Sequence, residues 1–549
     1  MREYALRAGL AFLIVCLSLP ACARTWNAKT DWHATGNGKT DDSAAIQRGL
    51  KSMATGDTVV FPSPGTYLFR STVHFKASGV RVKCEAGVSF VGANDGTAIF
   101  ADLKSNTAIG GSASTGCIFN GGGIQAYGGG GDGGQMLSQA ITNLTFTYNT
   151  FENMTYGPNN FRSNGGIFIG GGSSNVVIRH NTFSNIMPYD HGYNAAGRTY
   201  ENKYDPDGDA ARSAIWFYGG TNYSIDHNTF LNDYQNIKAC QGQQFQAQNI
   251  LIHHNFSDSH HRMFMEINTG NGCGNATYNA GIANFQVYDN YDLNAGGPQP
   301  AAFTFGFSAP FSQAIQPGSK DYSPITMSGV VWYNNLLKGV NFNSTTPGIG
   351  LEVGAENMNI YNNTIMSQWV TAGYGFIGTV GGYMQDNYAC MIPPTGVKKA
   401  YFGNSNGPTT VTYRGNQTPG YCPPGLTSLA ISLGPVTNTG GTLTATATVT
   451  TVEHGMQGVV FAVDGHYVSA VMGGGPYKLN FGAGGLPSGA HTVTATVVDA
   501  VGVLAVSGKQ SVSTTSKVGP SGPLTPNVDP AKQDFDIAGN ANDPINGRP

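Results

Sequence analysis

The sequence predicts an all-β protein, built as a parallel β-helix followed by a small antiparallel β-sandwich. Gly accounts for 77 of the 549 residues, roughly twice the usual share, and only 11% of the residues are charged. A short segment that contains an Asn recurs through the middle of the chain, and alternating Val, Thr and Ala fill the region after it. This composition excludes bundles and coiled coils rich in Glu and Lys. A formal net charge of −3, with no run rich in Lys or Arg, argues against a nucleic-acid partner.

Residues 1–23 are predicted to be a secretory signal peptide. Arg2 and Arg7 precede an apolar run over residues 8–19, and residues 21–23 (ACA) offer small side chains at a cleavage site. The mature chain is then expected to be secreted. A periplasmic location or a lipid anchor is the alternative, since residues 19–22 (LPAC) also resemble a bacterial lipobox. No later apolar run approaches the ~20 residues of a membrane-spanning helix.

Residues 31–46 (DWHATGNGKTDDSAAI) and 59–68 (VVFPSPGTYL) predict a short helix and the first strands. Thr40 or Asp41 is expected to cap an amphipathic helix that begins near Ser43 and covers the open first coil. These two segments resemble the start of right-handed parallel β-helix proteins of the pectate-lyase superfamily. The resemblance implies a right-handed β-helix over residues 24–424 and a carbohydrate substrate. It implies no particular reaction, because hydrolases, lyases, epimerases and phage tailspikes share such openings.

Near copies of one segment divide the middle of the chain into coils. Residues 147–151 (TYNTF), 179–183 (RHNTF) and 226–230 (DHNTF) each follow a short strand, and a matching Asn recurs at intervals of 24 to 47 residues. Such a period is typical of a solenoid in which each coil stacks on the last. We expect the Asn side chains to form an internal amide ladder and the glycines to occupy corners that need a positive φ. The expected ladder residues are Asn149, Asn181, Asn228, Asn255, Asn290, Asn335, Asn363 and Asn387.

One further strand in each coil carries the candidate active site. Alternation places one residue of each such strand outward, between apolar neighbours that point inward. Lys238 is then expected beside Glu266, with Glu352 two coils, roughly 9.6 Å, beyond Glu266. Three ionisable side chains on one strand face are informative in a chain with so few charges. The outward column comprises Phe168, Trp216, Lys238, Glu266, Thr304 and Glu352.

Two carboxylates at this spacing favour a glycoside hydrolase. Inverting glycosidases separate their acid and base by ~6.5–9.5 Å, so Glu266 and Glu352 are the catalytic candidates. The charge of Lys238 would keep Glu266 ionised, which suits a base. This hypothesis requires no cofactor. A structural Lys–Glu pair on the solenoid surface is the alternative explanation for the same pattern.

A uronan lyase is the competing hypothesis. Lys238 would remove the C5 proton, and a cation such as Ca²⁺ would neutralise the uronate carboxylate. Arg262 is a candidate to clamp a sugar carboxylate or hydroxyl, and Phe264 to stack on a ring face, because both share the parity of Glu266. His261 is a further substrate-binding candidate in the same segment.

Residues 189–212 form the most charged stretch of the chain and are expected to form one wall of the substrate-binding groove. Asp190 and Tyr204 are candidate sugar contacts there, together with Trp216 from the column. Residues 205–209 (DPDGD) alternate carboxylates as a calcium loop does, but Trp216 stands where an EF-hand has its bidentate Glu. A solvated loop therefore competes with a calcium site. Polygalacturonase signatures are not found in matching coils, which counts against that family and a galacturonan substrate.

Residues 425–516 are expected to form the β-sandwich. Residues 442–450 (TLTATATVT), 458–465 (GVVFAVDG) and 490–499 (AHTVTATVVD) alternate with period two. They resemble the bacterial Ig-like modules appended to secreted glycan enzymes, which implies a spacer or a weak binding module. Residues 517–549, rich in Pro, Asn and Asp, are expected to be disordered.

The six cysteines beyond the signal peptide fall into three successive pairs. The partners are separated by 33, 33 and 32 residues, which in an exported protein favours local disulfides over metal ligation. Unpaired buried thiols are the alternative. The expected bridges are Cys84–Cys117, Cys240–Cys273 and Cys390–Cys422.

The sequence therefore predicts a secreted, monomeric enzyme that cleaves a polysaccharide, with hydrolysis favoured over elimination. A non-catalytic glycan-binding or adhesion solenoid fits the same fold, because an Ig-like module is equally natural beside it.

Overall fold

The computed structural model describes residues 23–92, 98–112, 115–126, 140–155, 165–187, 213–233, 235–240, 246–258, 263–268, 282–295, 327–339, 351–353, 359–367, 371–377, 382–391, 399–406, 412–421, 429–450, 456–464, 466–472, 475–483, 486, 488–499 and 504–515. The predicted signal peptide (residues 1–22 of it) and the C-terminal tail lie outside these ranges.

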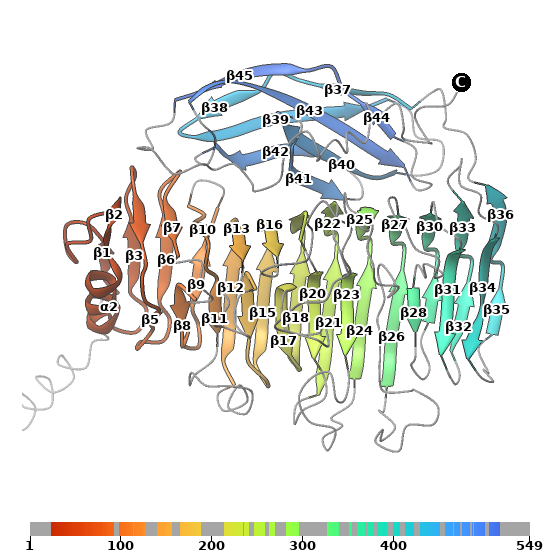
Figure 1. Ribbon diagram of the computed structural model, residues 1–549, viewed down its shortest axis with the longest axis horizontal. Coiled ribbons are helices and arrows are strands. Elements are labelled where there is room, and N and C mark those ends of the chain that lie inside the picture. The colour runs from red at the N-terminus through yellow and green to blue at the C-terminus, as the bar shows by residue number, and fades with distance from the viewer. Residues whose placement is uncertain are drawn as a thin grey trace, which may run out of the picture.

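Equivalent strands of successive coils pair in parallel and build a right-handed β-helix. Over the described residues, sheets A and B have 13 strands each, sheet C has seven and sheet D has three. Figure 1 shows the strands stacked along the length of the molecule. The chain therefore has the fold that the sequence predicts.

Sheets A and B run through all the coils. Sheet A comprises β1 (Thr25–Asn27), β3 (Thr58–Phe61), β6 (Arg81–Cys84), β9 (Ala108–Gly110), β12 (Thr142–Thr147), β15 (Ser174–Arg179), β18 (Gly220–Asp226), β21 (Ala247–His253), β24 (Ile282–Tyr288), β26 (Met327–Tyr333), β29 (Asn359–Tyr361), β32 (Tyr383–Gln385) and β35 (Thr412–Arg414). Sheet B comprises β2 (Asn37–Asp41), β4 (Thr66–Leu68), β7 (Ser89–Val91), β10 (Ile118–Asn120), β13 (Thr150–Thr155), β16 (Thr182–Met187), β19 (Thr229–Leu231), β22 (Phe256–Asp258), β25 (Tyr291–Ala295), β27 (Leu336–Gly339), β30 (Thr364–Ser367), β33 (Tyr388–Met391) and β36 (Gln417–Tyr421).

Sheets C and D form the third side. Sheet C comprises β5 (Val73–His74), β8 (Phe100–Ala101), β11 (Ile124–Ala126), β14 (Ile167–Ile169), β17 (Ser213–Tyr218), β20 (Gln235–Cys240) and β23 (Met263–Asn268). Sheet D comprises β28 (Leu351–Val353), β31 (Thr371–Ile377) and β34 (Lys399–Asn406).

An unbroken ladder of Asn side chains lines the turn between sheets A and B. Each Nδ2 donates to the Oδ1 of the ladder Asn in the next coil, at 2.9–3.1 Å. Each Nδ2 also donates to a backbone carbonyl of an earlier coil, as Asn255 does to Ile225 at 2.9 Å. From Asn149 to Asn387 the ladder residues are buried. The predicted ladder is confirmed, and it continues one coil further, to Asn416.

The residue before each ladder Asn has a left-handed backbone conformation. Among the described coils, only one has glycine at this position. That residue is Gly415, with a φ of 64°, where a Cβ would lie 2.0 Å from Asp386 Oδ1. Glycines do occupy other corners with a positive φ, as expected, such as Gly56 at 89° and Gly87 at 79°, but the ladder turn uses other residues. Asn, Asp and His tolerate the left-handed region better than most side chains. The non-glycine corners, with φ between 53° and 58°, are Tyr148, His180, His227, His254, Asp289, Asn334, Asn362 and Asp386.

Stacked aromatic rings fill the interior behind sheet B. Phe119, Phe151, Phe183 and Phe230 follow one another in successive coils, with ring centroids 4.9, 5.0 and 5.1 Å apart and nearly parallel planes. All four side chains are fully buried. Because the coil spacing of ~4.8 Å is close to the offset-stacking distance of two rings, the same residue type can repeat at this position.

Helix α2 (Ser43–Ser52) covers the N-terminal end of the β-helix, as predicted (Figure 1). Ile46 and Leu50 lie in the core of the β-helix. Gly49 permits the close approach of Trp32, since a Cβ there would lie 1.9 Å from the indole ring. The helix thus covers the open edge of the first coil.

The N-cap of α2 differs from the prediction of Thr40 or Asp41. Asp42 occupies the cap position, and its carboxylate accepts hydrogen bonds from the backbone amides of Thr35 and Gly36 instead of from the helix. Asp41 Oδ1 accepts from the backbone amide of Ser43 at 3.0 Å. The first turn is therefore held by the residue before the cap.

Two antiparallel sheets form a β-sandwich after the β-helix. One contains β37 (Ile431–Leu433), β38 (Thr437–Thr439), β39 (Thr442–Val449) and β42 (Tyr477–Gly482). The other contains β40 (Met456–Val463), β41 (His466–Met472), β43 (Gly489–Asp499), β44 (Leu504–Val506) and β45 (Gln510–Thr514). Alternate residues of both sheets, such as Leu443, Phe461 and Val493, share one apolar core.

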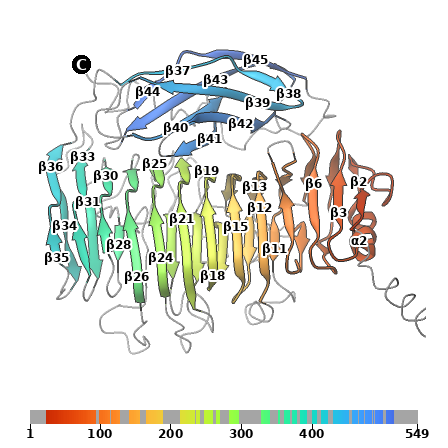
Figure 2. The same cartoon turned by 180° about the vertical axis from the view of Figure 1, so that it is seen from behind.

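The sandwich folds back along one flank of the β-helix (Figure 2). Strand β41 lies against β19 of sheet B. Near the first coils, a Cβ at Gly441 would lie 3.1 Å from the Cβ of Ala86. The C-terminal unit thereby reaches coils from which it is separated by hundreds of residues of chain.

One of the three predicted disulfides lies within the described residues. Cys84 and Cys117 are bonded, with a Cα–Cα distance of 5.1 Å, and link two successive coils. The partners Cys273 and Cys422 lie outside the described residues, so the pairs Cys240–Cys273 and Cys390–Cys422 stay predictions. No helix in the described ranges is long and apolar enough to cross a bilayer.

We predict that Asn255→Ala lowers the free energy of unfolding by about 3 kcal/mol, because it leaves several buried partners without a hydrogen bond. Asn255 Nδ2 donates to Ile225 and Asn290, and its Oδ1 accepts from Asn228. Chemical denaturation of the full chain measures the change. The control is Asn249→Gly, which removes an exposed amide–amide contact and tolerates the φ of 55°. Equal losses in both variants would contradict a stabilising role for the buried ladder.

Candidate functional site

The candidate active-site column lies on sheet C in the predicted order. The strand register places Phe168 beside Trp216, Trp216 beside Lys238, and Lys238 beside Glu266. Paired strands lie ~4.8 Å apart, so the backbones of Lys238 and Glu266 are direct neighbours in the sheet. The flanking residues Ile237 and Ala239 point into the core of the β-helix.

Aromatic rings surround the ammonium group of Lys238. Its Nζ lies 5.5 Å from the centroid of the Trp216 ring, within the range of a cation–π contact. The Trp216 ring packs edge-on against Phe168 at 4.9 Å and is stacked on Tyr218 at 5.3 Å. Trp216 Nε1 is buried and donates no hydrogen bond to any residue that the structure describes. The column therefore combines an ionic group with aromatic surface and a free N–H donor.

The described side chains of the column are covered. Phe168 is 2% exposed, Trp216 7% and Lys238 1%. Although these residues point away from the core cluster, they do not form an open surface. The side chain of Lys238 is therefore not accessible to a ligand in this structure.

Phe264 does not belong to the outward face, contrary to the prediction. It is 1% exposed and lies in the core of the β-helix, with its ring 6.4 Å from that of Phe230. Asn236, at the same place in the strand before, is also buried. Phe264 and the adjacent Met265 both lie in the core, so strict alternation does not hold at this point of β23. Phe264 is therefore unavailable to stack on a sugar.

The second carboxylate of the column is not positioned by pairing with sheet C. Glu352 lies on β28, which pairs with β31 of sheet D, where Glu352 is opposite Gly375. Thr304, the predicted link between the two, lies outside the described residues. The expected spacing of Glu266 and Glu352 stays a prediction.

The remaining predicted contacts lie outside the described residues. These are Asp190, Tyr204, His261, Arg262 and the candidate calcium loop 205–209. Among the described residues, no group of three or more His, Cys, Asp or Glu side chains is arranged to hold a metal ion.

A second ionisable cluster, which the sequence prediction missed, lies at the ends of the sheet A strands. Asp226 accepts hydrogen bonds from Arg179 Nε at 2.5 Å and Nη2 at 3.1 Å, and from Ser224 Oγ at 2.6 Å. His227 Nδ1 lies 2.7 Å from the same carboxylate, and His253 Nε2 lies 4.0 Å from it. The Asp226 side chain is fully buried.

The cluster continues into the next coils through two histidines. The Nδ1 atoms of His253 and His254 are 2.8 Å apart, and His254 Nε2 lies 3.8 Å from Asp289 Oδ2. The His253 ring stacks on Tyr288 at 4.7 Å, and Tyr333 stacks on Tyr288 at 4.8 Å. These residues occupy the two positions before the ladder Asn of each coil, where the sequence has charged and aromatic side chains.

The two carboxyl groups of the cluster have pKa values displaced in opposite directions. Burial would raise the pKa of Asp226, but hydrogen bonds from His227, Arg179 and Ser224 outweigh it and hold the pKa well below its usual range. Burial raises the pKa of Asp289, and His254 only partly offsets this. Burial lowers the pKa of His253 to about 4.

The geometry of Asp226 fits a clamp between coils better than a catalytic acid or base. Arg179 and Asp226 are opposite each other in adjacent strands β15 and β18. Both oxygens of Asp226 are occupied by protein donors, and no surface of the carboxylate is open to a substrate. The bidentate pair therefore ties two coils together.

Comparison with known proteins supports the N-terminal resemblance. Residues 26–253 match the family described as "Rhamnogalacturonase A/epimerase, pectate lyase-like". No curated protein sequence matches the chain significantly.

Several solved structures are similar to this chain at low identity. An endo-xylogalacturonan hydrolase from Aspergillus tubingensis is 14% identical, with a TM-score of 0.37, covering 69% of this chain and 100% of its own. A tailspike protein of E. coli bacteriophage HK620 is 11% identical, with a TM-score of 0.38, covering 89% of this chain and 93% of its own. An alginate lyase from Paenibacillus is 12% identical, with a TM-score of 0.22, covering 71% of this chain and 98% of its own.

We predict that Asp226→Asn lowers the free energy of unfolding by about 3 kcal/mol at pH 7, because Arg179 loses its buried partner. A lowered carboxyl pKa adds stability that is complete above about pH 4 and declines as the pH falls toward the folded-state pKa. The cost of the substitution should therefore shrink by about 1 kcal/mol between pH 5 and pH 3. Denaturant titrations across this pH range test both statements.

Asp289→Asn is the matched control, since the raised pKa of Asp289 means that its charge is unfavourable in the folded state. This variant should be as stable as the wild type, or more stable, at pH 7. A cost for Asp226→Asn that does not change with pH would contradict the clamp.

Proposed function

We propose that this protein is a secreted enzyme that cleaves a polysaccharide at the sheet C column, with glycoside hydrolysis favoured. The observation that carries the proposal is the register that sets Lys238 between Trp216 and Glu266 on one strand face. Aromatic surface binds the apolar faces of sugar rings, and an adjacent ionic pair supplies proton transfer. The match of residues 26–253 to a pectate-lyase-like family supports a carbohydrate substrate.

In the hydrolytic mechanism, Glu266 and Glu352 are the acid and base. One carboxylic acid donates its proton to the glycosidic oxygen, while the other carboxylate removes a proton from the water that attacks the anomeric carbon. The ammonium group of Lys238 beside Glu266 favours the ionised carboxylate, which suits the base. Trp216 is proposed to orient the sugar, and no cofactor is needed.

The burial of Lys238 adds a requirement to this mechanism. Because only 1% of the side chain is exposed, substrate binding must be coupled to opening of the cover over the column.

Elimination is the alternative that the same column supports. Lys238, held over Trp216, would remove the C5 proton of a uronic acid, after which the C4–O bond breaks and leaves an unsaturated end. Arg262, or a calcium ion held by acidic residues, would neutralise the uronate carboxylate in that reaction. A glycan-binding or adhesion solenoid without catalysis is the second alternative.

Secretion is supported by the disulfide as well as by the N-terminal segment. Disulfides persist mainly in oxidising compartments, and Cys84–Cys117 links two coils close to the start of the β-helix. We propose that the chain is exported through the signal peptide predicted at residues 1–23. The sandwich is proposed to be an Ig-like module.

We predict that Glu266→Gln and Glu352→Gln each reduce polysaccharide cleavage by at least about 100-fold, because each removes a proton-transfer group. New reducing ends without absorbance at 235 nm identify hydrolysis, whereas absorbance at 235 nm identifies elimination. Lys238→Ala should move the acidic limb of the pH–rate profile to higher pH if Lys238 acts through Glu266. Loss of all activity in Lys238→Ala, together with sensitivity to chelators, would instead support the lyase.

The control for these variants is Gln248→Ala, an exposed side chain on β21 of sheet A, which should cleave at the wild-type rate. Near wild-type cleavage by both Glu variants would refute the hydrolase. No cleavage of any polymer in a broad panel by the wild type would favour a binding protein.

A further inference from the structure

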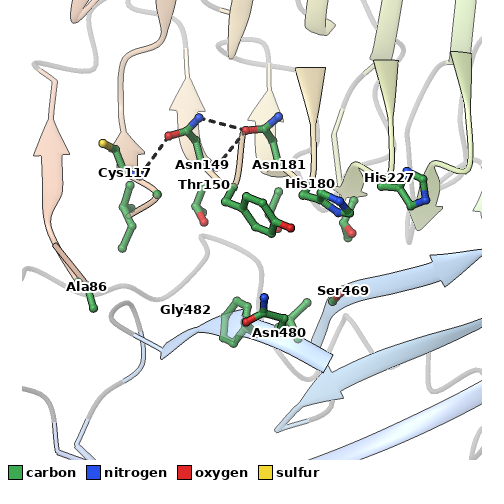
Figure 3. Close-up of a pocket in the computed structure, with 18 residues that line it drawn as sticks. Ala86, Cys117, Asn149, Thr150, His180, Asn181, His227, Ser469, Asn480 and Gly482 are labelled. Carbon is green, nitrogen blue, oxygen red and sulfur yellow. Dashed lines mark hydrogen bonds between the residues drawn. The ribbon is translucent and has the colours of Figure 1, made fainter. Parts of the chain in front are cut away.

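A polar cleft separates the sandwich from the turns that carry the Asn ladder (Figure 3). Tyr148, His180 and His227 line it on the β-helix side, and Ser469, Asn480 and Phe481 line it on the sandwich side. The space between these residues, including the part open to solvent, is about 660 Å³.

Polar groups converge on the cleft without using their hydrogen-bonding capacity. Within the described part of the chain, the side chains of Tyr148, His180, Ser469 and Asn480 form no hydrogen bond with other protein groups. His227 binds Asp226 through Nδ1, which leaves its Nε2 unpaired on the same basis. Figure 3 shows Ser469 and Asn480 across the cleft from His180 and His227. A ligand with several hydroxyl groups would satisfy these donors and acceptors.

The lining of the cleft lacks the strongly charged residue types. It contains no Lys, Arg, Asp or Glu. Burial, assisted by the neighbouring His227, lowers the pKa of His180 to about 4, and burial raises the pKa of Tyr148. The nearby Asp226 is neutralised by its bidentate pairing with Arg179. Such a lining suits an uncharged ligand better than a uronate or phosphate.

The β-helix side of the cleft is held rigid by the fold. The Tyr148 and His180 rings are stacked at 4.7 Å, and His180 lies 5.0 Å from the ring of His227. Asp226 fixes the orientation of the His227 ring through a 2.7 Å contact. Groups that are already positioned lose little entropy when they bind, so this wall is preorganised.

We propose that this cleft is a binding site for a neutral oligosaccharide segment. The sugar hydroxyls would bond to His180, His227 and Asn480, and the Phe481 ring would pack against an apolar sugar face. The site is formed jointly by the β-helix and the sandwich, and lies on the ladder turn instead of on sheet C. It is independent of the proposed catalytic column.

Affinity electrophoresis of the full chain tests the proposal. Native gels would contain galactomannan, xyloglucan, mixed-linkage β-glucan, arabinogalactan, linear galactan or xylan, with polygalacturonate as the acidic comparison. All proteins carry Glu266→Gln, so that cleavage does not alter the gels. We expect at least one neutral polymer to retard the protein, and His180→Ala and Asn480→Ala each to raise the dissociation constant at least five-fold.

Two further variants make the test specific. Ser469→Trp fills the cleft and should weaken binding more than ten-fold. Lys478→Ala lies two residues from Asn480 on the same exposed face of β42, outside the cleft lining, and should bind as the parent does. Near-UV circular dichroism would verify that each variant is folded, and the exposed Asn480 offers a substitution that leaves the cores of both units intact.

Three results would overturn the site. The first is that no neutral polymer retards the protein. The second is that a neutral polymer retards the protein equally in all three cleft variants. The third is that polygalacturonate alone binds in a way that depends on the cleft residues. Loss of cleavage in the catalytic variants with retained cleft binding, or the reverse, separates this inference from the proposed function.

Discussion

The stacking interval of parallel strands, ~4.8 Å per coil, is the constraint on which the rest of this structure depends. It brings equivalent residues of every coil into contact, so a side chain that pairs well with its own kind can repeat. Asn does so in the buried ladder, and Phe does so behind sheet B. The same interval sets Lys238 against Glu266 and Arg179 against Asp226. Structure and candidate chemistry therefore share one geometric origin.

That constraint also explains which features were predictable. The ladder was predictable because each Asn sits in a recognisable segment, and stacking follows once the coils are counted. The order Phe168, Trp216, Lys238 was predictable because alternation within a strand is a local property. The amide chemistry of Asn and the pleat of a strand need no knowledge of distant residues.

The features that sequence reasoning missed are not determined by the local pattern. Phe264 was assigned to the outward face by strict alternation, but both Phe264 and its neighbour Met265 lie in the core. The near copies at residues 179–183 and 226–230 already align Arg179 with Asp226, but the sequence does not show that the two side chains form a buried clamp. The cleft beside His180 depends on how the sandwich docks, for which a sequence of alternating Val and Thr provides no signal.

The folded-back position of the sandwich has a mechanical consequence for the β-helix. A stack in which each coil contacts only its neighbours can unravel progressively from an end. Here β41 rests against β19, while the chain around Gly441 reaches Ala86 near the opposite end from the last coil. The sandwich thus contacts coils that are far apart in the stack and holds them together. Separation of the coil of Ala86 from the coil of β19 must disturb this shared unit, so these distant coils resist unravelling together.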